Sequence, residues 1–284
     1  MIQLGISAFY HDASACLVKD GKVLAAAEEE RFTGIKHDDS FPYNSIKWCL
    51  EYSGISTSDI DEVCWYENPE LKRDRILKTF KKHPIKTYFL RKKYNKVTSI
   101  SQNVETIVKD TFKRDIPIKY TDHHLSHAAF AYFSSPYKES AILTVDGVGE
   151  WETLTISHAK GNIITKKYNV SFPNSLGLLY STFTAYLGFK PNEGEYKVMG
   201  LAPYGDPTQY YSKLYSLFKG DKINQRYFTW EYSDKIMFNR KLASFLNLEP
   251  RLPEEELTQQ HKNLAAAIQK VYEVKFLEYV RLAK

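Results

Sequence analysis

Cysteine is scarce in this chain, which has only Cys16, Cys49 and Cys64 in 284 residues. The three lie among apolar neighbours, form no CxxC pair and have no adjacent histidine. This pattern excludes a disulfide framework and argues against a cysteine nucleophile. We therefore expect buried core thiols and a reducing, cytoplasmic location.

Long apolar runs are also missing, and none could cross a membrane. The first residues lack the basic start and apolar stretch of a signal peptide. Hydrophobic residues make up 43% and charged residues 26% of the chain, values that are ordinary for a soluble globular protein. The length allows one large domain or two lobes, and we expect no membrane partner.

Negative charge is almost absent from one segment. Between residues 72 and 96, eleven Lys and Arg accompany one acid, Asp74, so this segment carries +10 and the remainder −5 of the net +5. Tyr88, Phe89 and Tyr94 are interleaved with these cations. A polyanion could bind here, but without a nucleic-acid motif a solvated surface excursion is the favoured interpretation. A nucleic-acid partner is therefore not expected.

One layout occurs twice along the chain. A buried strand at 4–9 precedes a turn and a hairpin of strands 14–18 and 22–27, joined by Asp20-Gly21. In the second half a strand at 141–145, a turn at 146–149 and a strand at 152–157 lead through 158–161 to a strand at 163–168. The repeat predicts a duplicated α/β fold with two lobes around a cleft. We place the first lobe at 1–138, with a basic helical excursion at 68–113, and the second at 139–284.

Further elements follow from capping and periodicity. Asn44 is expected to cap a helix that stops at Gly54, and Asn174-Ser175 one that runs over 176–187 and stops at Gly188. Strands are predicted at 62–65 and 116–120. Apolar residues at helical spacing predict a last helix that includes Leu264 and Ile268 and continues to the end of the chain.

Two histidines suggest a metal site. His123 and His127 are four residues apart, so a helix would place them on one face about 5–6 Å from each other. The alternative for such a pair is capping and core hydrogen bonding. Asp146, at a predicted strand end, supplies an oxygen ligand and favours the metal. Two nitrogens and a carboxylate suit iron, manganese or zinc, whereas zinc proteolysis would need a glutamate directly after the first histidine.

The turn that follows Asp146 resembles a phosphate-binding loop. Gly147 and Gly149 would let backbone N–H groups approach a phosphate closely. Glu150 and Glu152 are unusual neighbours for a phosphate unless a metal intervenes. A tight β-turn is the simpler alternative.

The corresponding first turn carries His11, Asp12 and Ser14. His11 would point into the same cleft, where it could act as a general base near neutral pH. Lys36, in the charged segment 28–38, could neutralise a phosphate or an oxyanion. From composition alone, a solvated charged loop is the favoured interpretation of that segment.

Six stretches of sequence, in this order, resemble the NodU/CmcH family of O-carbamoyltransferases. They are GISAFYHDASACLV (5–18), EEERFTGIKHD (28–38), HHLSHAAFAYF (123–133), ILTVDGVGEWET (142–153), NSLGLLYS (174–181) and EGEYKVMGLAPYG (193–205). The resemblance implies an N-terminal module like those of actin, sugar kinases and the tRNA threonylcarbamoyl-adenosine transferases, with the duplicated ribonuclease H-like fold. It also implies a following YrdC-like domain, which makes carbamoyl-adenylate from ATP and carbamoyl phosphate. The module would pass the carbamoyl group to the hydroxyl of a small-molecule acceptor, with an iron-type metal (Fe²⁺ before Mn²⁺ or Zn²⁺) holding the adenylate phosphate.

The resemblance also implies roles for particular residues. His123, His127 and Asp146 match the metal ligands, His11 matches the base for the acceptor hydroxyl, and Lys36 matches an active-site lysine. The expected phosphate and nucleotide residues are Asp12, Gly147, Gly149, Glu150, Asn174, Gly177, Gly194 and Lys197.

In one respect the sequence departs from the family, since it stops near half of the expected length. The adenosine loop, a further aspartate ligand and the YrdC-like domain would come later, so we expect an N-terminal piece with an incomplete second lobe. The acceptor could be a nodulation oligosaccharide, an aminoglycoside, a cephem or another metabolite, and a homodimer is compatible with the sequence. Alternatives are a tRNA threonylcarbamoyl transferase, a sugar kinase, and a non-catalytic metal- or nucleotide-binding module.

Overall fold

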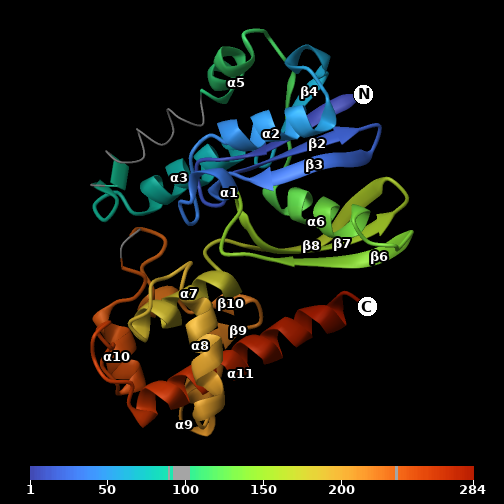
Figure 1. Cartoon of the computed structure of the whole chain (residues 1–284). Coiled ribbons are helices and arrows are strands. Elements are labelled where there is room, and N and C mark those ends of the chain that lie inside the picture. The colour runs from blue at the N-terminus through green and yellow to red at the C-terminus, as the bar shows by residue number, and fades with distance from the viewer. Residues whose placement is uncertain (89, 92–102, 234–235) are drawn as a thin grey trace. The chain divides into compact units, whose positions relative to one another are not determined.

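The computed structural model describes residues 1–88, 90–91, 103–233 and 236–284 (Figure 1). It divides into two compact units, which we treat separately. The first comprises Met1–Arg73 with Lys93–Ser126, and the second Asp74–Lys92 with His127–Lys284. The lobes at 1–138 and 139–284 remain a prediction.

A mixed five-stranded sheet forms the centre of the first unit. Its order is β3-β2-β1-β4-β5, with antiparallel pairing among the first three strands and parallel pairing of β4 and β5. Asp20 and Gly21 both have positive φ, as the tight hairpin between β2 and β3 requires. The predicted α/β class is confirmed. The strands are β1 (Ile2–Ser7), β2 (Ser14–Lys19), β3 (Lys22–Glu28), β4 (Glu62–Trp65) and β5 (Ile118–Tyr120).

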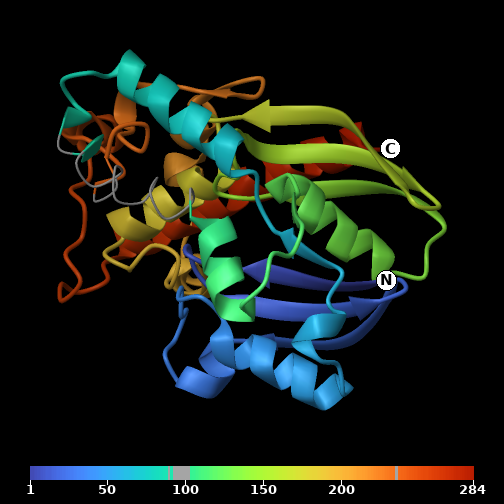
Figure 2. The same cartoon turned by 90° about the horizontal axis from the view of Figure 1, so that it is seen from above.

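Helix α2 (Tyr43–Ser53) covers one face of this sheet (Figures 1 and 2). Leu4 and Leu17 alternate with more exposed neighbours and form a core with Ile46 and Cys49 of the helix. Cys49 is fully buried, as expected of a core thiol, and burial raises its pKa to about 11. Cys16 and Cys64 are only half-buried, so the expectation of three buried thiols holds for Cys49 alone. The other helices of the unit are α1 (Glu30–Thr33), η1 (Thr57–Asp59) and α5 (Val104–Phe112).

The predicted cap of α2 is wrong, although its predicted stop at Gly54 (φ 63°) is confirmed. The helix begins at Tyr43, and the carboxylate of Glu29 accepts hydrogen bonds from the backbone N–H groups of Asn44 (3.1 Å) and Ser45 (2.8 Å). Glu29 is only 2% exposed. The capping group therefore comes from another part of the chain, which a local sequence pattern does not reveal.

The second unit contains a three-stranded antiparallel sheet in the order β6-β7-β8. It repeats the strand–loop–strand–hairpin–strand layout of β1 to β3, as predicted. The turn is shorter than predicted, because His158, Ala159 and Lys160 remain in β7 and Gly161 (φ 58°) makes the turn. Ala159 is fully buried, which keeps this end of the strand in the sheet. The strands are β6 (Glu139–Val145), β7 (Glu152–Lys160) and β8 (Ile163–Ser171).

Helices α7 (Leu176–Tyr186) and α11 (Gln259–Leu282) dominate the rest of the second unit. The predicted cap of α7 is confirmed, because Ser175 Oγ accepts a hydrogen bond from the N–H of Leu178 at 3.0 Å. Leu264 and Ile268 are buried, as their spacing predicted. Among the described residues, no helix is long and apolar enough to cross a membrane. The remaining elements are α8 (Glu195–Leu201), η2 (Ala202–Tyr204), α9 (Thr208–Tyr215), β9 (Phe218–Lys219), β10 (Lys222–Ile223), η3 (Gln225–Tyr227) and α10 (Arg240–Leu246).

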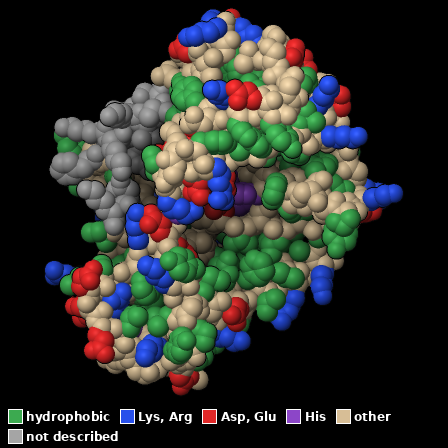
Figure 3. Space-filling view, in the orientation of Figure 1, with side chains coloured by type: hydrophobic (Ala, Val, Ile, Leu, Met, Phe, Trp, Pro, Cys, Tyr) green, Lys and Arg blue, Asp and Glu red, His purple; other side chains and the backbone are tan. Residues whose placement is uncertain are grey.

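The basic segment is not simply a solvated excursion. Helix α3 (Pro69–Lys82) and the residues after it pack within the second unit from Asp74 onward. Lys82 Nζ lies 2.5 Å from a carboxylate oxygen of Glu231, and Lys86 Nζ lies 4.1 Å from the ring centre of Tyr232. In the view of Figure 3, charges of both signs are interspersed over the described surface. Phe89, Lys92, Lys93, Tyr94 and Lys96 lie outside the described residues.

Candidate functional site

Helix α6 (His123–Phe133) carries both predicted histidine ligands on successive turns. The hydroxyl of Ser126 donates a 2.9 Å hydrogen bond to the carbonyl oxygen of Tyr66, and the His123 ring meets the Tyr66 ring edge-on at 5.9 Å. These contacts hold the start of the helix against the end of β4. His124, between the two predicted ligands, is buried at 1% exposure.

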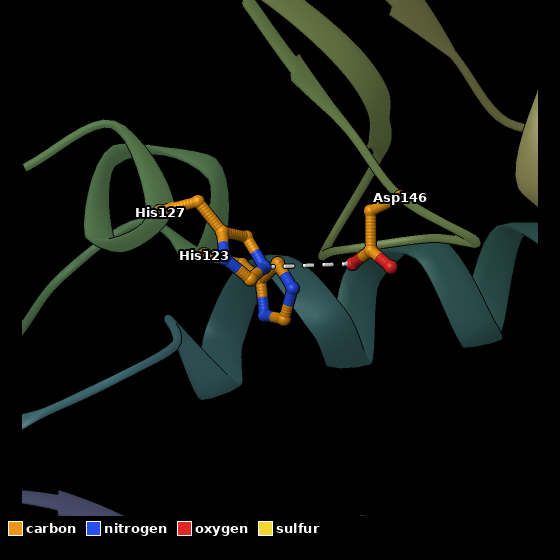
Figure 4. Close-up of side chains that lie close together, drawn as sticks. All are labelled: His123, His127 and Asp146. Atoms are coloured by element: carbon orange, nitrogen blue, oxygen red, sulfur yellow. Dashed lines mark ion pairs between the residues drawn. The ribbon is translucent and has the colours of Figure 1, made fainter. Parts of the chain in front are cut away.

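Asp146 follows β6 and faces the end of the histidine pair (Figure 4). Its Oδ2 lies 3.8 Å from His127 Nε2, and its Oδ1 accepts a 2.6 Å hydrogen bond from the N–H of Gly147. One ligand atom from each of His123, His127 and Asp146 lies within 4.8 Å of the others. Ligands at about 2.0–2.2 Å from one ion are separated by roughly 3–4 Å, so a small side-chain adjustment would let the three hold a divalent cation.

Helix α7 supports the turn that carries Asp146. A Cβ atom on Gly177 would lie 2.7 Å from the carbonyl oxygen of Asp146, so only glycine allows this approach of helix and turn. Ser175, which is 1% exposed, donates from its hydroxyl to the carbonyl oxygen of Gly147 at 2.7 Å. Gly177 therefore has a packing role here in addition to the phosphate role predicted for it.

The N–H groups of the turn are used internally. Gly147 donates to Asp146 Oδ1, and Gly149 donates to the carbonyl oxygen of Glu152 at 2.8 Å. A phosphate would have to displace these contacts to receive the two hydrogen bonds that the sequence predicted. Glu150 is buried beside them. Phosphate binding by Gly147, Gly149 and Glu150 stays a prediction.

The remaining predicted nucleotide residues have structural contacts in the second unit. Asn174 Oδ1 accepts a 2.9 Å hydrogen bond from the N–H of Ile223 at β10. A Cβ on Gly194 would lie 2.8 Å from the carbonyl oxygen of Lys190, so this glycine permits a tight turn before α8. Lys197 is exposed, with Nζ 5.9 Å from the ring centre of Phe189. Their nucleotide roles stay predictions.

A second cluster forms around Asp12, between β1 and β2. Asp12 Oδ2 lies 2.7 Å from His11 Nδ1, and Asp12 Oδ1 lies 2.8 Å from His37 Nδ1. Burial acts to raise the pKa of Asp12, but hydrogen bonds to His37 and His11 outweigh it and hold the pKa below its ordinary value. Sequence reasoning missed the role of His37, although it lies next to Lys36, because only the fold brings it to Asp12.

Lys36 belongs to the same cluster through Glu30. Its Nζ lies 3.1 Å from each carboxylate oxygen of Glu30, and the N–H of His37 donates to the same group. The Lys36 side chain is 72% exposed, and that of Glu30 only 12%. The predicted residues thus form two groups. His11, Asp12 and Lys36 lie on the loops that follow β1 and α1, and the metal ligands lie with Gly147 and Gly177 at the turn that follows β6.

The two duplicated sheets and the histidine–aspartate group define an α/β protein with a candidate metal centre. A family model described as the N-terminus of carbamoyltransferases matches residues 2–284. The chain therefore belongs to the carbamoyltransferase family, and the resemblance seen in the sequence is confirmed.

Particular relatives agree with this family. The uncharacterised protein sll1178 of Synechocystis is 42% identical over 284 residues, which cover 95% of this chain and 46% of the relative. Nodulation protein NolNO of Sinorhizobium fredii is 35% identical over 271 residues, covering 93% of this chain and 37% of NolNO. The chain thus spans less than half the length of these two relatives.

A solved structure is similar at a coarser level. Component A of (R)-2-hydroxyglutaryl-CoA dehydratase from Acidaminococcus fermentans aligns with 97% of this chain and 99% of its own, at 13% identity and a TM-score of 0.37.

Proposed function

We propose that this chain is the transfer module of an O-carbamoyltransferase. In the whole protein, a YrdC-like domain would make carbamoyl-adenylate from ATP and carbamoyl phosphate. The module would then pass the carbamoyl group to a hydroxyl of a sugar or secondary metabolite. The observation that carries the proposal is the convergence of His123, His127 and Asp146 in a chain of this family.

The metal-binding role follows from the donor chemistry. Two imidazoles and one carboxylate would hold iron, manganese or zinc with coordination positions left for substrate, and Fe²⁺ is our first choice. Such an ion, when bound, neutralises charge on the adenylate phosphate. The hydrogen bond from Gly147 to Asp146 Oδ1 orients the carboxylate and leaves Oδ2 toward His127.

The transfer itself needs a base at the acceptor. His11 accepts the proton of the hydroxyl while the hydroxyl oxygen forms a bond to the carbamoyl carbon. The bond between that carbon and the phosphate oxygen breaks, and AMP leaves with the electron pair. Lys36 would exchange Glu30 for the phosphate when substrate arrives, since its side chain is largely exposed.

A tRNA substrate has less support. This alternative rested on the basic segment, and Lys82 and Lys86 of that segment already contact Glu231 and Tyr232. Filter binding of tRNA over a range of salt concentrations separates the alternatives, because phosphate contacts would give a steep salt dependence.

Metal titration of the purified chain tests the site. We expect one Co²⁺ or Fe²⁺ per chain in the wild type and at least a tenfold loss of affinity in His127→Ala, since loss of even a supporting group costs about 10–100-fold. His158→Ala is the matched control, because His158 is half-exposed on β7 and pairs with Glu139 at 2.9 Å. Equal affinity in wild type and His127→Ala would remove the metal site.

A transfer assay tests the activity separately. Preformed carbamoyl-adenylate is mixed with the chain and a panel of hydroxylated saccharides, aminoglycosides and cephems, and products are detected by mass. We expect a carbamoylated product that wild type forms and His11→Gln does not. Failure across the panel, or synthesis by this chain from ATP and carbamoyl phosphate alone, would contradict the assignment of a transfer module.

A further inference from the structure

One carboxylate holds two imidazoles in the loop between β1 and β2. Both oxygens of Asp12 are engaged, Oδ2 with His11 Nδ1 and Oδ1 with His37 Nδ1, at 2.7 and 2.8 Å. Both contacts use Nδ1 of the histidine. Asp12 therefore holds each ring with its Nδ1 atom toward the carboxylate.

The chemistry of the contacts decides where the ring protons lie. An ionised carboxylate only accepts hydrogen bonds, so the Nδ1 atoms of His11 and His37 must both carry hydrogen. In a neutral ring, Nε2 then has the free lone pair.

The backbone is built to hold this contact. The N–H of Phe9 donates to the carbonyl oxygen of Asp39 at 2.8 Å, and that of Ala13 donates to the carbonyl oxygen of Asp38 at 2.7 Å. These bonds join the two loops on either side of the cluster. Asp12 and His37 both have positive φ, 51° and 56°, which is uncommon outside glycine. Two loops that are distant in sequence are thus locked together at the carboxylate.

A second metal site is the competing explanation, because ligand atoms of Asp12, Glu30 and His37 also lie within 4.8 Å of one another. The ammonium group of Lys36 contacts both oxygens of Glu30 at 3.1 Å, however, and both oxygens of Asp12 are already engaged. A cation would have to displace the Lys36 ammonium group from Glu30 and break the contact between Asp12 and His37. The hydrogen-bonded arrangement is therefore favoured.

We propose that Asp12 is a positioning residue that holds His11 as the Nδ1–H tautomer, so that Nε2 takes the proton of the acceptor hydroxyl. His37 fixes the other oxygen of Asp12 and prevents the carboxylate from turning away. This inference rests on the proposed transfer function. The proton moves from the hydroxyl to Nε2, and Asp12 stays ionised throughout.

Other charged and aromatic groups surround the pair and bear on its titration. The ring of Tyr10 lies 4.8 Å from that of His11, and Lys72 Nζ lies 5.6 Å from the Tyr10 ring centre. Lys72 also pairs with Glu67 at 2.8 Å. The Glu30–Lys36 pair and the buried carboxylate of Asp38 lie on the other loop. The Asp38 carboxylate accepts hydrogen bonds from the Thr33 hydroxyl and the Ser40 N–H.

Asp12→Asn tests the proposal. Asparagine is nearly isosteric and tolerates positive φ, so the loop should keep its backbone. The amide can donate at one position and accept at the other, so it cannot accept from both imidazoles. Asp39→Asn is the matched control, because Asp39 has an exposed side chain in the same loop pair and contributes only its carbonyl oxygen to the contact.

The main measurement is nitrogen-15 NMR of the histidine rings, with His11 assigned by comparison with His11→Gln. We expect the Nδ1–H tautomer at His11 in the wild type and in Asp39→Asn. In Asp12→Asn we expect a shift toward the Nε2–H tautomer, because the carboxylate that accepts from both Nδ1–H groups is lost. An unchanged His11 tautomer in Asp12→Asn would overturn the proposal.

A transfer assay supplies the kinetic consequence. We expect kcat to fall about 10- to 100-fold in Asp12→Asn with KM little changed. Equal kcat in Asp12→Asn and wild type would also overturn the proposal. If the NMR result is as expected but wild type transfers no carbamoyl group, Asp12 still positions His11 and the proposed transfer function is what fails.

Discussion

Gly177 gives the sharpest test of how the fold holds the metal-binding turn. In Gly177→Ala, the new Cβ would lie 2.7 Å from the carbonyl oxygen of Asp146 and 2.8 Å from the backbone nitrogen of Gly147. Real Cβ atoms do not approach backbone this closely, so α7 or the turn must shift. Overpacking of this kind costs about 1–3 kcal/mol, and the better helix propensity of alanine returns about 1 kcal/mol or less at a helix end. We expect a net loss of about 1–2 kcal/mol in the free energy of unfolding.

The control is Gly200→Ala in α8, where an added Cβ meets nothing within 4 Å. There the same substitution should stabilise by up to about 1 kcal/mol, because only helix propensity changes. Both variants are compared by urea unfolding followed by circular dichroism. Metal titration in the same samples should show weaker binding in Gly177→Ala alone, since the Asp146 carboxylate moves with its turn. Equal stability and metal affinity in the two variants would refute the close approach of α7 to Asp146.

Three further predictions concern groups outside this turn. Glu29→Ala should lower the free energy of unfolding, measured in urea, by about 2–4 kcal/mol, because it leaves the start of α2 uncapped and its buried partners unsatisfied. Glu28 is exposed, and Glu28→Ala should change the same quantity by less than about 0.5 kcal/mol. The folded-state pKa of Asp12 is lowered, so its contribution to stability is present above the unfolded pKa and is lost as pH falls through the folded pKa. The free energy of unfolding, measured as pH falls below 4, should therefore decrease less in Asp12→Asn than in wild type. Cys49, with a pKa of about 11, should react with iodoacetamide near pH 8 only after urea unfolding, and rapid labelling of the folded chain would contradict its burial.

Local signals in the sequence predicted the elements that depend on near neighbours. The Asp20-Gly21 hairpin, the stops at Gly54 and Gly188, and the Ser175 cap all require a particular backbone angle or a side chain within three residues. The first two strands were also predicted, although β1 spans Ile2–Ser7 rather than 4–9. The spacing of His123 and His127 placed both on one helix face, since that follows from helix geometry alone.

Contacts between distant segments could not be derived in the same way. Asn44 was expected to cap its own helix, but the fold brings the Glu29 carboxylate to that position. Lys82 is exposed as predicted, but its partner Glu231 is 149 residues away and could not be predicted from local composition. A composition window records charge and hydrophobicity but not which segment will pack against it.

The sequence by itself determined the repeated strand layout and the pairing of His123 with His127, because strand propensity, turn chemistry and helical spacing act over a few residues. The family followed from the resemblance of six stretches of sequence, which also implied Asp146 as the third candidate ligand. Only the tertiary structure decided that Gly177 lies against the backbone of Asp146 and that Asp12 joins His11 to His37. Each of these contacts joins segments that are distant in sequence within one unit, and a hydrogen bond or close approach forms only when the topology places its two atoms within a few ångströms.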